Sequence, residues 1–192
     1  MRATGHGSRP RNIYKRMAAG GGTRFRGATH KLLADLRGQP VVAHVLDAVT
    51  AAGLDAVYVV VGAVDVPVPD GCVVVSNPRW AEGMATSLAA GVAAAGADGH
   101  DAVVVGLGDQ PLAEPAAWRL VAATDAPIAI ATYDGERGNP VRLARAVWPL
   151  LPTTGDVGAR KLAREREDLV VEVACPGNPT DVDTVEDLER WS

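Results

Sequence analysis

Hydrophobic positions along the chain fall into short uninterrupted runs, separated by stretches with helical spacing. The runs are rich in β-branched residues and too short for helices, which is typical of strands buried on both faces of a parallel sheet. The predicted strands cover residues 56–61, 72–75, 102–107, 127–131 and 169–174. Helical spacing covers residues 40–49, 83–95, 114–123 and 157–166, and a last helix is expected from residue 184. This alternation predicts an α/β domain with a doubly wound, mostly parallel sheet and helices on both faces.

Local signals mark where some of these helices begin and end. Pro40 stands at the favoured first position of one helix, and Gly53 follows it as a stop signal. Near the end of the chain, Thr184 and Asp187 have the spacing of a capping box. We therefore expect Thr184 to be the N-cap of the last helix.

The first 16 residues break the pattern. Residues 11–16 lie where a first central strand belongs, but they carry three charges and only two apolar side chains. A strand buried in a parallel sheet is normally apolar. We therefore expect residues 1–16 to form a basic N-terminal segment that is flexible or a poorly formed first strand, and residues 17–192 to form one domain.

Composition restricts the classes of partner. With 192 residues, 47% hydrophobic and 22% charged, the chain is typical of one globular domain. Beyond residue 16 it has 14 basic and 23 acidic residues, which argues against a nucleic-acid-binding surface. No apolar run approaches the ~18 residues of a membrane span. The basic N-terminus lacks the apolar core of a secretory signal. The two cysteines, Cys72 and Cys175, give neither a disulfide framework nor a metal-binding spacing, so we expect buried thiols in a cytoplasmic protein without membrane contacts.

A glycine cluster is the densest chemical signal. Glycines at 20–22 are followed by Arg24 and Lys31, and such a loop can bring backbone N–H groups and positive charge to phosphate oxygens. It is not a Walker A loop, because Ala28 stands where that motif needs lysine. The alternative is a glycine-rich turn whose cations are incidental.

Three carboxylates form the second signal. Asp109 is the second residue after the predicted strand 102–107, in the crevice where open α/β sheets bind ligands. Asp181 and Asp183 stand one residue apart just ahead of a helix start, and if the segment is extended they point the same way. Carboxylates of this kind suit Mg²⁺ that bridges phosphates. Asp109 could equally cap its loop, and Asp183 could simply favour the helix N-terminus.

Two further stretches carry weaker signals. Thr86 and Ser87 lie at a helix start and could donate to a base or ribose, although hydroxyls inside helices more often bond their own backbone. Residues 138–140, with the sequence GNP, have the composition of a turn.

Taken in order, these motifs resemble a known family. The matching strings are AAGGGTRFRGATHK at 18–31, NPRWAEGMATSL at 77–88, LGDQPL at 107–112, RGNPV at 137–141, TGDVGARKL at 154–162 and DVDTVEDL at 181–188. They resemble the MobA-like nucleotidyltransferases, and among these the molybdenum cofactor cytidylyltransferase branch. The resemblance implies a Rossmann-like fold of the nucleotide-diphospho-sugar transferase type. It also implies transfer of a nucleoside monophosphate from an NTP to a phosphorylated cofactor such as molybdopterin, with release of pyrophosphate.

The resemblance also assigns residues to each step. It implies catalytic roles for Arg24, Lys31 and Asp109. It also implies that Asp109 coordinates Mg²⁺, with Asp183 or Asp181 as the second ligand. Nucleotide binding goes to Ala18, Ala19, Gly20, Gly21, Gly22, Arg24, Lys31, Asn77, Gly83 and Ser87. The acceptor is expected to face Gly138, Asn139 and Pro140. A molybdoenzyme or its chaperone is an expected protein partner.

Three alternatives stay open at this point. CTP is favoured over GTP, because the segment 18–20 resembles the cytidylyl branch more than the guanylyl branch. A guanylyltransferase of deazaflavin (F420) cofactor biosynthesis would share the fold and use other phosphorylated acceptors. The polar first strand and Arg26, which separates Phe25 from Gly27, also fit an accessory protein that binds nucleotides but has lost the chemistry.

Overall fold

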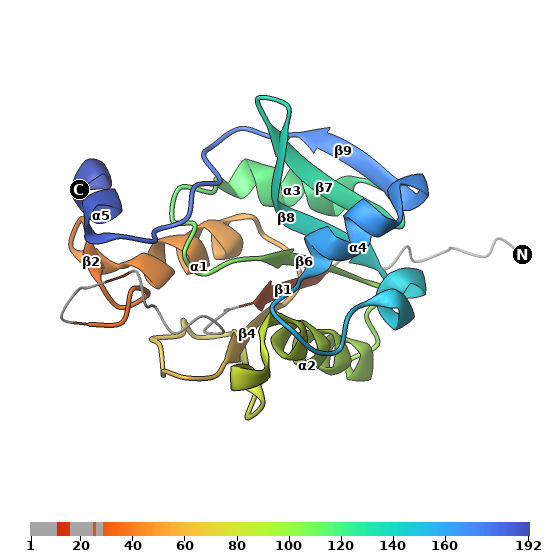
Figure 1. Ribbon diagram of the computed structural model, residues 1–192, viewed down its shortest axis with the longest axis horizontal. Helices are drawn as coiled ribbons and strands as arrows, with labels where there is room; N and C mark the ends of the chain where they lie inside the picture. Colours follow the sequence, from red (N-terminus) through yellow and green to blue (C-terminus); the bar gives the residue numbers. More distant parts are fainter. Residues whose placement is uncertain (1–10, 16–24, 26–28) are drawn as a thin grey trace, which may run out of the picture.

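One mixed sheet organises the part of the chain that the computed structural model describes, which is residues 11–15, 25 and 29–192 (Figure 1). Its strand order is β5-β4-β1-β6-β8-β7-β9, and β8 alone of these seven strands runs antiparallel to its neighbours. The strands are β1 Arg11–Lys15, β4 Val57–Val61, β5 Val73–Ser76, β6 Ala102–Gly106, β7 Ile128–Tyr133, β8 Glu136–Ala144 and β9 Val170–Ala174. Two short strands, β2 Asp35–Leu36 and β3 Gln39–Pro40, pair separately.

Helices cover both faces of the sheet. They are α1 Val41–Ala51, α2 Met84–Ala97, α3 Pro115–Ala123, α4 Ala159–Glu165 and α5 Val185–Trp191, with 3-10 helices at Trp80–Glu82, Arg145–Leu150 and Glu167–Leu169. Val59 and Val104 belong to the core under α1, α3 and α5, whereas Val60 and Val103 belong to the core under α2 and α4. Alternate residues of a strand thus fill opposite cores. Among the described helices, none has the length and apolar character needed to cross a membrane.

The α/β fold with its mostly parallel sheet is confirmed. All five predicted strands and all five predicted helices are present, with ends that differ from the expected ones by two residues at most. The capping box is also present, because the Thr184 hydroxyl accepts a hydrogen bond from the Asp187 N–H and the Asp187 carboxylate accepts one from the Thr184 N–H.

A first strand, one of the two alternatives expected for the N-terminal segment, is present at residues 11–15. These residues form β1 at the centre of the sheet, paired in parallel with β4 on one side and β6 on the other. Pairing on both edges satisfies the backbone donors and acceptors of the strand, and this tertiary context outweighs its polar composition. Residues 1–10 and 16 lie outside the described part of the chain.

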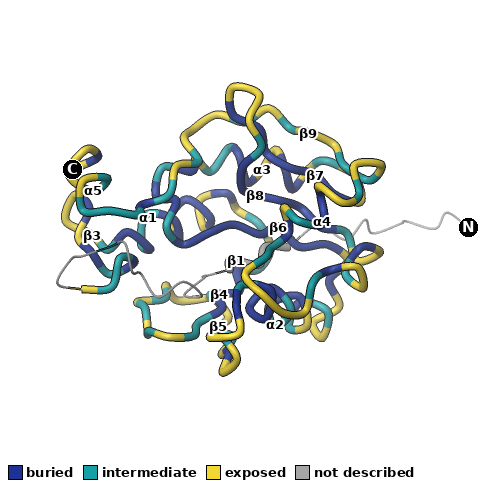
Figure 2. The backbone as a smooth tube through the Cα atoms, in the orientation of Figure 1, coloured by how far each residue is buried: buried dark blue, intermediate teal, exposed yellow. Residues whose placement is uncertain are grey.

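Two other expectations need correction. Residues 138–140 do not form a turn but lie within β8, where its register against β7 shifts between the pairs Arg137–Thr132 and Val141–Ile130. Glycine and proline are common at such irregular points of a strand. The second correction concerns β5 and β9, which were expected to be buried but are the two edge strands of the sheet, with exposed positions along both (Figure 2). Val74 of β5 is 55% exposed and Val171 of β9 is 45% exposed.

Candidate functional site

The loop after β6 and the segment before α5 meet at the carboxyl edge of the sheet. The backbone N–H of Val182 donates a hydrogen bond of 2.7 Å to the carbonyl oxygen of Asp109. The Val182 side chain is completely buried in the core under α1 and α3. It therefore anchors its two neighbours, Asp181 and Asp183, beside Asp109.

Lys31 joins two of these carboxylates. Its Nζ lies 2.6 Å from Oδ2 of Asp109 and 3.0 Å from Oδ1 of Asp183. The side chains of Lys31 and Asp109 are only 13% and 15% exposed. Burial by itself lowers the pKa of Lys31, but the charges of both carboxylates and their hydrogen bonds outweigh it, so its pKa is raised. Lys31 is thus a permanent cation held between two acids.

Asp181 has a different environment from the other two carboxylates. Burial, reinforced by the negative charges of Asp109 and Asp183, raises its pKa to about 6, although a hydrogen bond from Gln110 and the charge of Lys31 act against this. Gln110 Nε2 donates to Asp181 Oδ1 at 2.6 Å and to the carbonyl oxygen of Pro179 at 2.6 Å. Asp181 is therefore fixed by an amide rather than by a cation.

Gln110 also connects the carboxylates to β8. Its Oε1 accepts a hydrogen bond of 3.1 Å from Asn139 Nδ2, and both amide side chains are buried. The carbonyl oxygen of Asn139 accepts a hydrogen bond from the Tyr133 hydroxyl at 2.7 Å. Hydrogen bonds of Gln110 thus connect the predicted acceptor segment to Asp181. The sequence analysis did not single out Gln110 as a site residue. Its position directly after Asp109 was the available signal.

The residues expected around the base and ribose are buried. Asn77 Nδ2 donates to the hydroxyls of Thr86 and Ser87, at 2.9 Å in each case. Asn77 and Ser87 are 4% and 2% exposed. These hydrogen bonds satisfy the polar groups of the three buried side chains. They also hold the start of α2 and the 3-10 helix before it in place.

Gly83, which precedes α2, packs against the loop before α4. A Cβ on Gly83 would overlap the Gly155 carbonyl group and lie 2.8 Å from the Asp156 nitrogen. The Ala85 N–H donates to the Gly155 carbonyl oxygen at 3.0 Å. Glycine is required here by both this close approach and a φ of +107°.

A small cavity lies between the start of α2, β8 and α4. Its volume is about 30 Å³, and it is bordered by Met84 at the start of α2, Leu107 after β6, Asn139 of β8 and Arg160 of α4. The structure therefore brings the predicted acceptor residue Asn139 next to the helix that Gly83 begins.

The predicted phosphate cradle lies outside the described residues. This applies to Ala18, Ala19, Gly20, Gly21, Gly22 and Arg24. These residues follow β1 in the sequence, and β1 runs parallel to β6 and ends at the same edge of the sheet as Asp109. Their assignment to the triphosphate stays a prediction.

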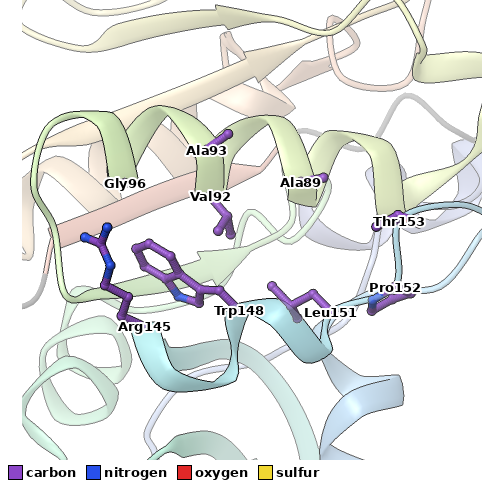
Figure 3. A pocket seen from close by; sticks show the side chains of 9 residues that line it. All are labelled: Ala89, Val92, Ala93, Gly96, Arg145, Trp148, Leu151, Pro152 and Thr153. Carbon is purple, nitrogen blue, oxygen red and sulfur yellow. The ribbon is translucent and has the colours of Figure 1, made fainter.

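A larger groove elsewhere contains no predicted site residue (Figure 3). It has a volume of about 280 Å³ and lies between α2 and the 3-10 helix Arg145–Leu150, with Trp148 and Leu151 in its wall. The Arg145 guanidinium lies 5.5 Å from the centre of the Trp148 ring. Arg145 follows the end of β8 that pairs with the start of β6, so this end of the groove is at the opposite edge of the sheet from Asp109.

The donor set fits a divalent cation of the magnesium type. Among the described residues, no three His, Cys, Asp or Glu side chains are grouped as a metal site. However, Mg²⁺ is commonly held by one or two carboxylates, with waters and substrate phosphates completing its shell. Asp109 and Asp183 already hold one cation, the Lys31 ammonium, within 3.0 Å. This pair could hold a metal ion together with a nucleotide.

These features define a nucleotidyltransferase-type α/β domain, and comparison with known proteins gives the family. The MobA-like NTP transferase domain matches residues 17–170, and the chain belongs to that family. Crystal structures of Rv0371c from Mycobacterium tuberculosis H37Rv share its fold. One of them is 28% identical, with a TM-score of 0.76, and covers 94% of this chain and 97% of that one. Another, described as a complex with manganese, is 27% identical, with a TM-score of 0.75, and covers 96% and 98% of the two chains.

Two other matches are lower in sequence identity or cover less of the chain. A nucleotidyl transferase from Methanothermobacter thermautotroptrophicus is 24% identical, with a TM-score of 0.75, and the match covers 94% of this chain and 95% of that one. The bifunctional protein GlmU of Sinorhizobium fredii is 39% identical over 101 residues, or 50% of this chain. The match spans only 22% of that curated relative's length.

Proposed function

We propose that this NTP transferase moves a nucleoside monophosphate, CMP in preference to GMP, from the triphosphate to a phosphorylated cofactor such as molybdopterin, with Mg²⁺ and release of pyrophosphate. The observation that carries the proposal is the position of Lys31 between Asp109 and Asp183 at the carboxyl edge of the sheet. This edge is where open α/β sheets bind nucleotides. The family match and the manganese complex of a relative support the reaction class and the metal dependence.

The charged side chains would act on the phosphates. Lys31 is held cationic by its partners, so it can bind the triphosphate at any physiological pH. Asp109, with Asp183 or Asp181, would hold Mg²⁺. A divalent ion bound there supplies charge neutralisation for the pyrophosphate that leaves.

The acceptor would provide its own nucleophile. An oxygen of its phosphate attacks the α-phosphorus of the NTP, the bond from the α-phosphorus to the bridging oxygen breaks, and the electron pair leaves with pyrophosphate. Such a transfer depends on in-line positioning rather than on a protein nucleophile. Gly138, Asn139 and Pro140 would face the acceptor, and the bond from Asn139 to Gln110 would fix them relative to Asp181.

The nucleotide-binding role of the remaining residues is part of the same proposal. Arg24 and the backbone of residues 18–22 would hold the triphosphate. Asn77 and Ser87, which are buried, would act through the shape of the loop at Gly83 rather than by direct contact with the nucleotide. A cytoplasmic molybdoenzyme or its chaperone would receive the product.

Pyrophosphate release is the direct test. Each of the four NTPs is combined with Mg²⁺ and either molybdopterin or a phospholactate acceptor of the deazaflavin route. Pyrophosphate with CTP and molybdopterin is expected. Asp109→Asn should reduce the rate by about 10²-fold or more, because it removes a metal ligand, whereas the exposed Asp47→Asn should have no effect. Pyrophosphate only with GTP and phospholactate, or nucleotide binding without any turnover, would refute the proposal.

A further inference from the structure

Lys31 takes the position that a metal ion bound by both Asp109 and Asp183 would need. Its Nζ contacts Oδ2 of Asp109 at 2.6 Å and Oδ1 of Asp183 at 3.0 Å. Mg²⁺ binds carboxylate oxygens at about 2.0–2.1 Å, so an ion that bridged these same two oxygens would overlap the ammonium group. Lys31 and such an ion therefore exclude each other.

Charge extends this exclusion beyond direct overlap. A divalent ion could use the other oxygen of either carboxylate, but it would then lie beside the positive charge of Lys31. The side chains of Lys31 and Asp109 are only 13% and 15% exposed, so water screens that repulsion incompletely. A free divalent ion should therefore bind weakly as long as Lys31 stays between the two carboxylates.

The backbone of Lys31 is fixed, whereas its side chain can change partners. The next residue, Leu32, is 1% exposed, and its carbonyl oxygen accepts a hydrogen bond of 3.1 Å from the Val42 N–H. Lysine carries its charge on a flexible four-carbon stem, so rotation about that stem can move the ammonium group without any change in the fold. The Asp183 side chain is 46% exposed, which leaves the carboxylates open to solvent on that side.

We propose that Lys31 competes with a free divalent cation for Asp109 and Asp183, and that it releases both carboxylates when a nucleoside triphosphate binds its ammonium group. The part of the nucleotide in this exchange rests on the proposed function, in which Lys31 binds the triphosphate. Lys31 would then free the carboxylates at the moment when phosphate oxygens can complete the shell of Mg²⁺. In this way Lys31 couples the two ligands, and by linkage each strengthens the binding of the other by the same factor.

Titration with Mn²⁺ alone tests the competition without a nucleotide. The electron paramagnetic resonance signal of the free ion gives its affinity for the full-length wild type, Lys31→Met and Lys161→Met. Lys31→Met should bind Mn²⁺ at least about tenfold more tightly than the wild type, because the competing charge is gone. Lys161→Met is the matched control, since Lys161 also forms an ion pair, with Glu165 on α4, and it should keep the wild-type affinity.

Two further variants locate the effect. Lys31→Arg keeps the positive charge and should keep Mn²⁺ binding as weak as in the wild type. The gain should disappear in Lys31→Met/Asp109→Asn, which lacks one of the two carboxylates. Equal Mn²⁺ affinity in Lys31→Met and the wild type, or a gain that also occurs in Lys31→Arg or survives Asp109→Asn, would overturn the proposal.

The wild type itself provides a measurement that does not depend on Lys31→Met. The chain has three lysines, Lys15, Lys31 and Lys161, so ¹³C labelling of the lysine ε-carbons gives three resonances, which the spectra of Lys31→Arg and Lys161→Met assign. Mg²⁺ together with α,β-methylene-CTP should shift the Lys31 resonance, whereas the same concentration of Mg²⁺ alone should leave it in place. An equal shift by Mg²⁺ alone, or no shift with the bound analogue, would contradict the exchange of partners.

Turnover separates this inference from the proposed function. If pyrophosphate is released but Lys31→Met binds Mn²⁺ no more tightly than the wild type, the competition is wrong and the reaction stands. If Lys31→Met binds Mn²⁺ more tightly but no NTP supports turnover, the reaction is wrong and the competition stands.

Discussion

The contact between Gly83 and the loop before α4 gives a prediction whose size follows from the geometry. Gly83 has a φ of +107° and a ψ of 174°, a conformation found almost only in glycine. A methyl group at this position would overlap the backbone carbonyl of Gly155 and approach the Asp156 nitrogen to 2.8 Å. Backbone atoms cannot rotate away as the end of a side chain can, so Gly83→Ala must displace the loop or the start of α2.

Two costs add in this variant. The unfavourable φ and ψ contribute about 1–3 kcal/mol, and overpacking contributes a further ~1–3 kcal/mol. We therefore expect Gly83→Ala to lower the free energy of unfolding by about 2–6 kcal/mol. Gly99→Ala is the matched control, because Gly99 also has a positive φ, +80°, but no atom lies within 4 Å of its added Cβ. It should cost only about 1 kcal/mol.

Urea unfolding followed by tryptophan fluorescence measures both variants. Both variants place alanine at a positive φ, but only Gly83→Ala also drives the added Cβ into the Gly155 carbonyl group. In thermal unfolding, Gly83→Ala should melt several degrees below Gly99→Ala, given ~2–4 °C per kcal/mol for a chain of this size. Equal destabilisation by the two substitutions would refute the close packing of this loop against α2.

Three further predictions concern side chains of the site and the core. Lys31→Met should lower the free energy of unfolding of the metal-free protein by about 1–3 kcal/mol in urea at pH 7, because its carboxylate partners lose their cation. A destabilisation that persisted at pH 3 would contradict this prediction. Asp181, with its pKa raised to about 6, keeps a proton in the native state that the unfolded chain releases near pH 4. The free energy of unfolding of the metal-free protein should therefore fall by about 1–2 kcal/mol as the pH rises from 4 to 6, and Asp181→Asn should abolish this pH dependence. Gly106→Ala would drive a methyl group into the Trp118 ring, with Cζ2 at 2.7 Å, and should cost about 1–3 kcal/mol; an unchanged melting temperature would argue against that packing.

Much of the fold could be predicted because its signals are local. The apolar runs of β4, β6 and β7 are buried on both faces, so each is visible without knowledge of its neighbours. The capping box of α5 lies within four residues. The position of Asp109 at the carboxyl edge followed from the end of one strand, and its proximity to Asp183 is consistent with the predicted shared cation site.

The remaining features depend on contacts between distant parts of the chain. β1 is polar, and it is a central strand because β4 and β6 pair with its two edges. Residues 138–140 have the composition of a turn, but β6 and β7 flank them and make them the irregular part of a strand. The Gln110 link to Asn139 and Asp181 joins residues separated by 29 and 71 positions, so no local pattern contains it.

Calorimetric titration of CTP into the wild type and Asp109→Asn, each with Mg²⁺ and with EDTA, tests the central claim most directly. Asp109 and Lys31 are expected to bind the metal–triphosphate complex together, so Mg²⁺ should strengthen CTP binding to the wild type at least about tenfold. This metal-dependent gain should be absent in Asp109→Asn and fully kept in Asp47→Asn. CTP affinity that is the same with Mg²⁺ and with EDTA, or a gain that survives Asp109→Asn, would contradict the account.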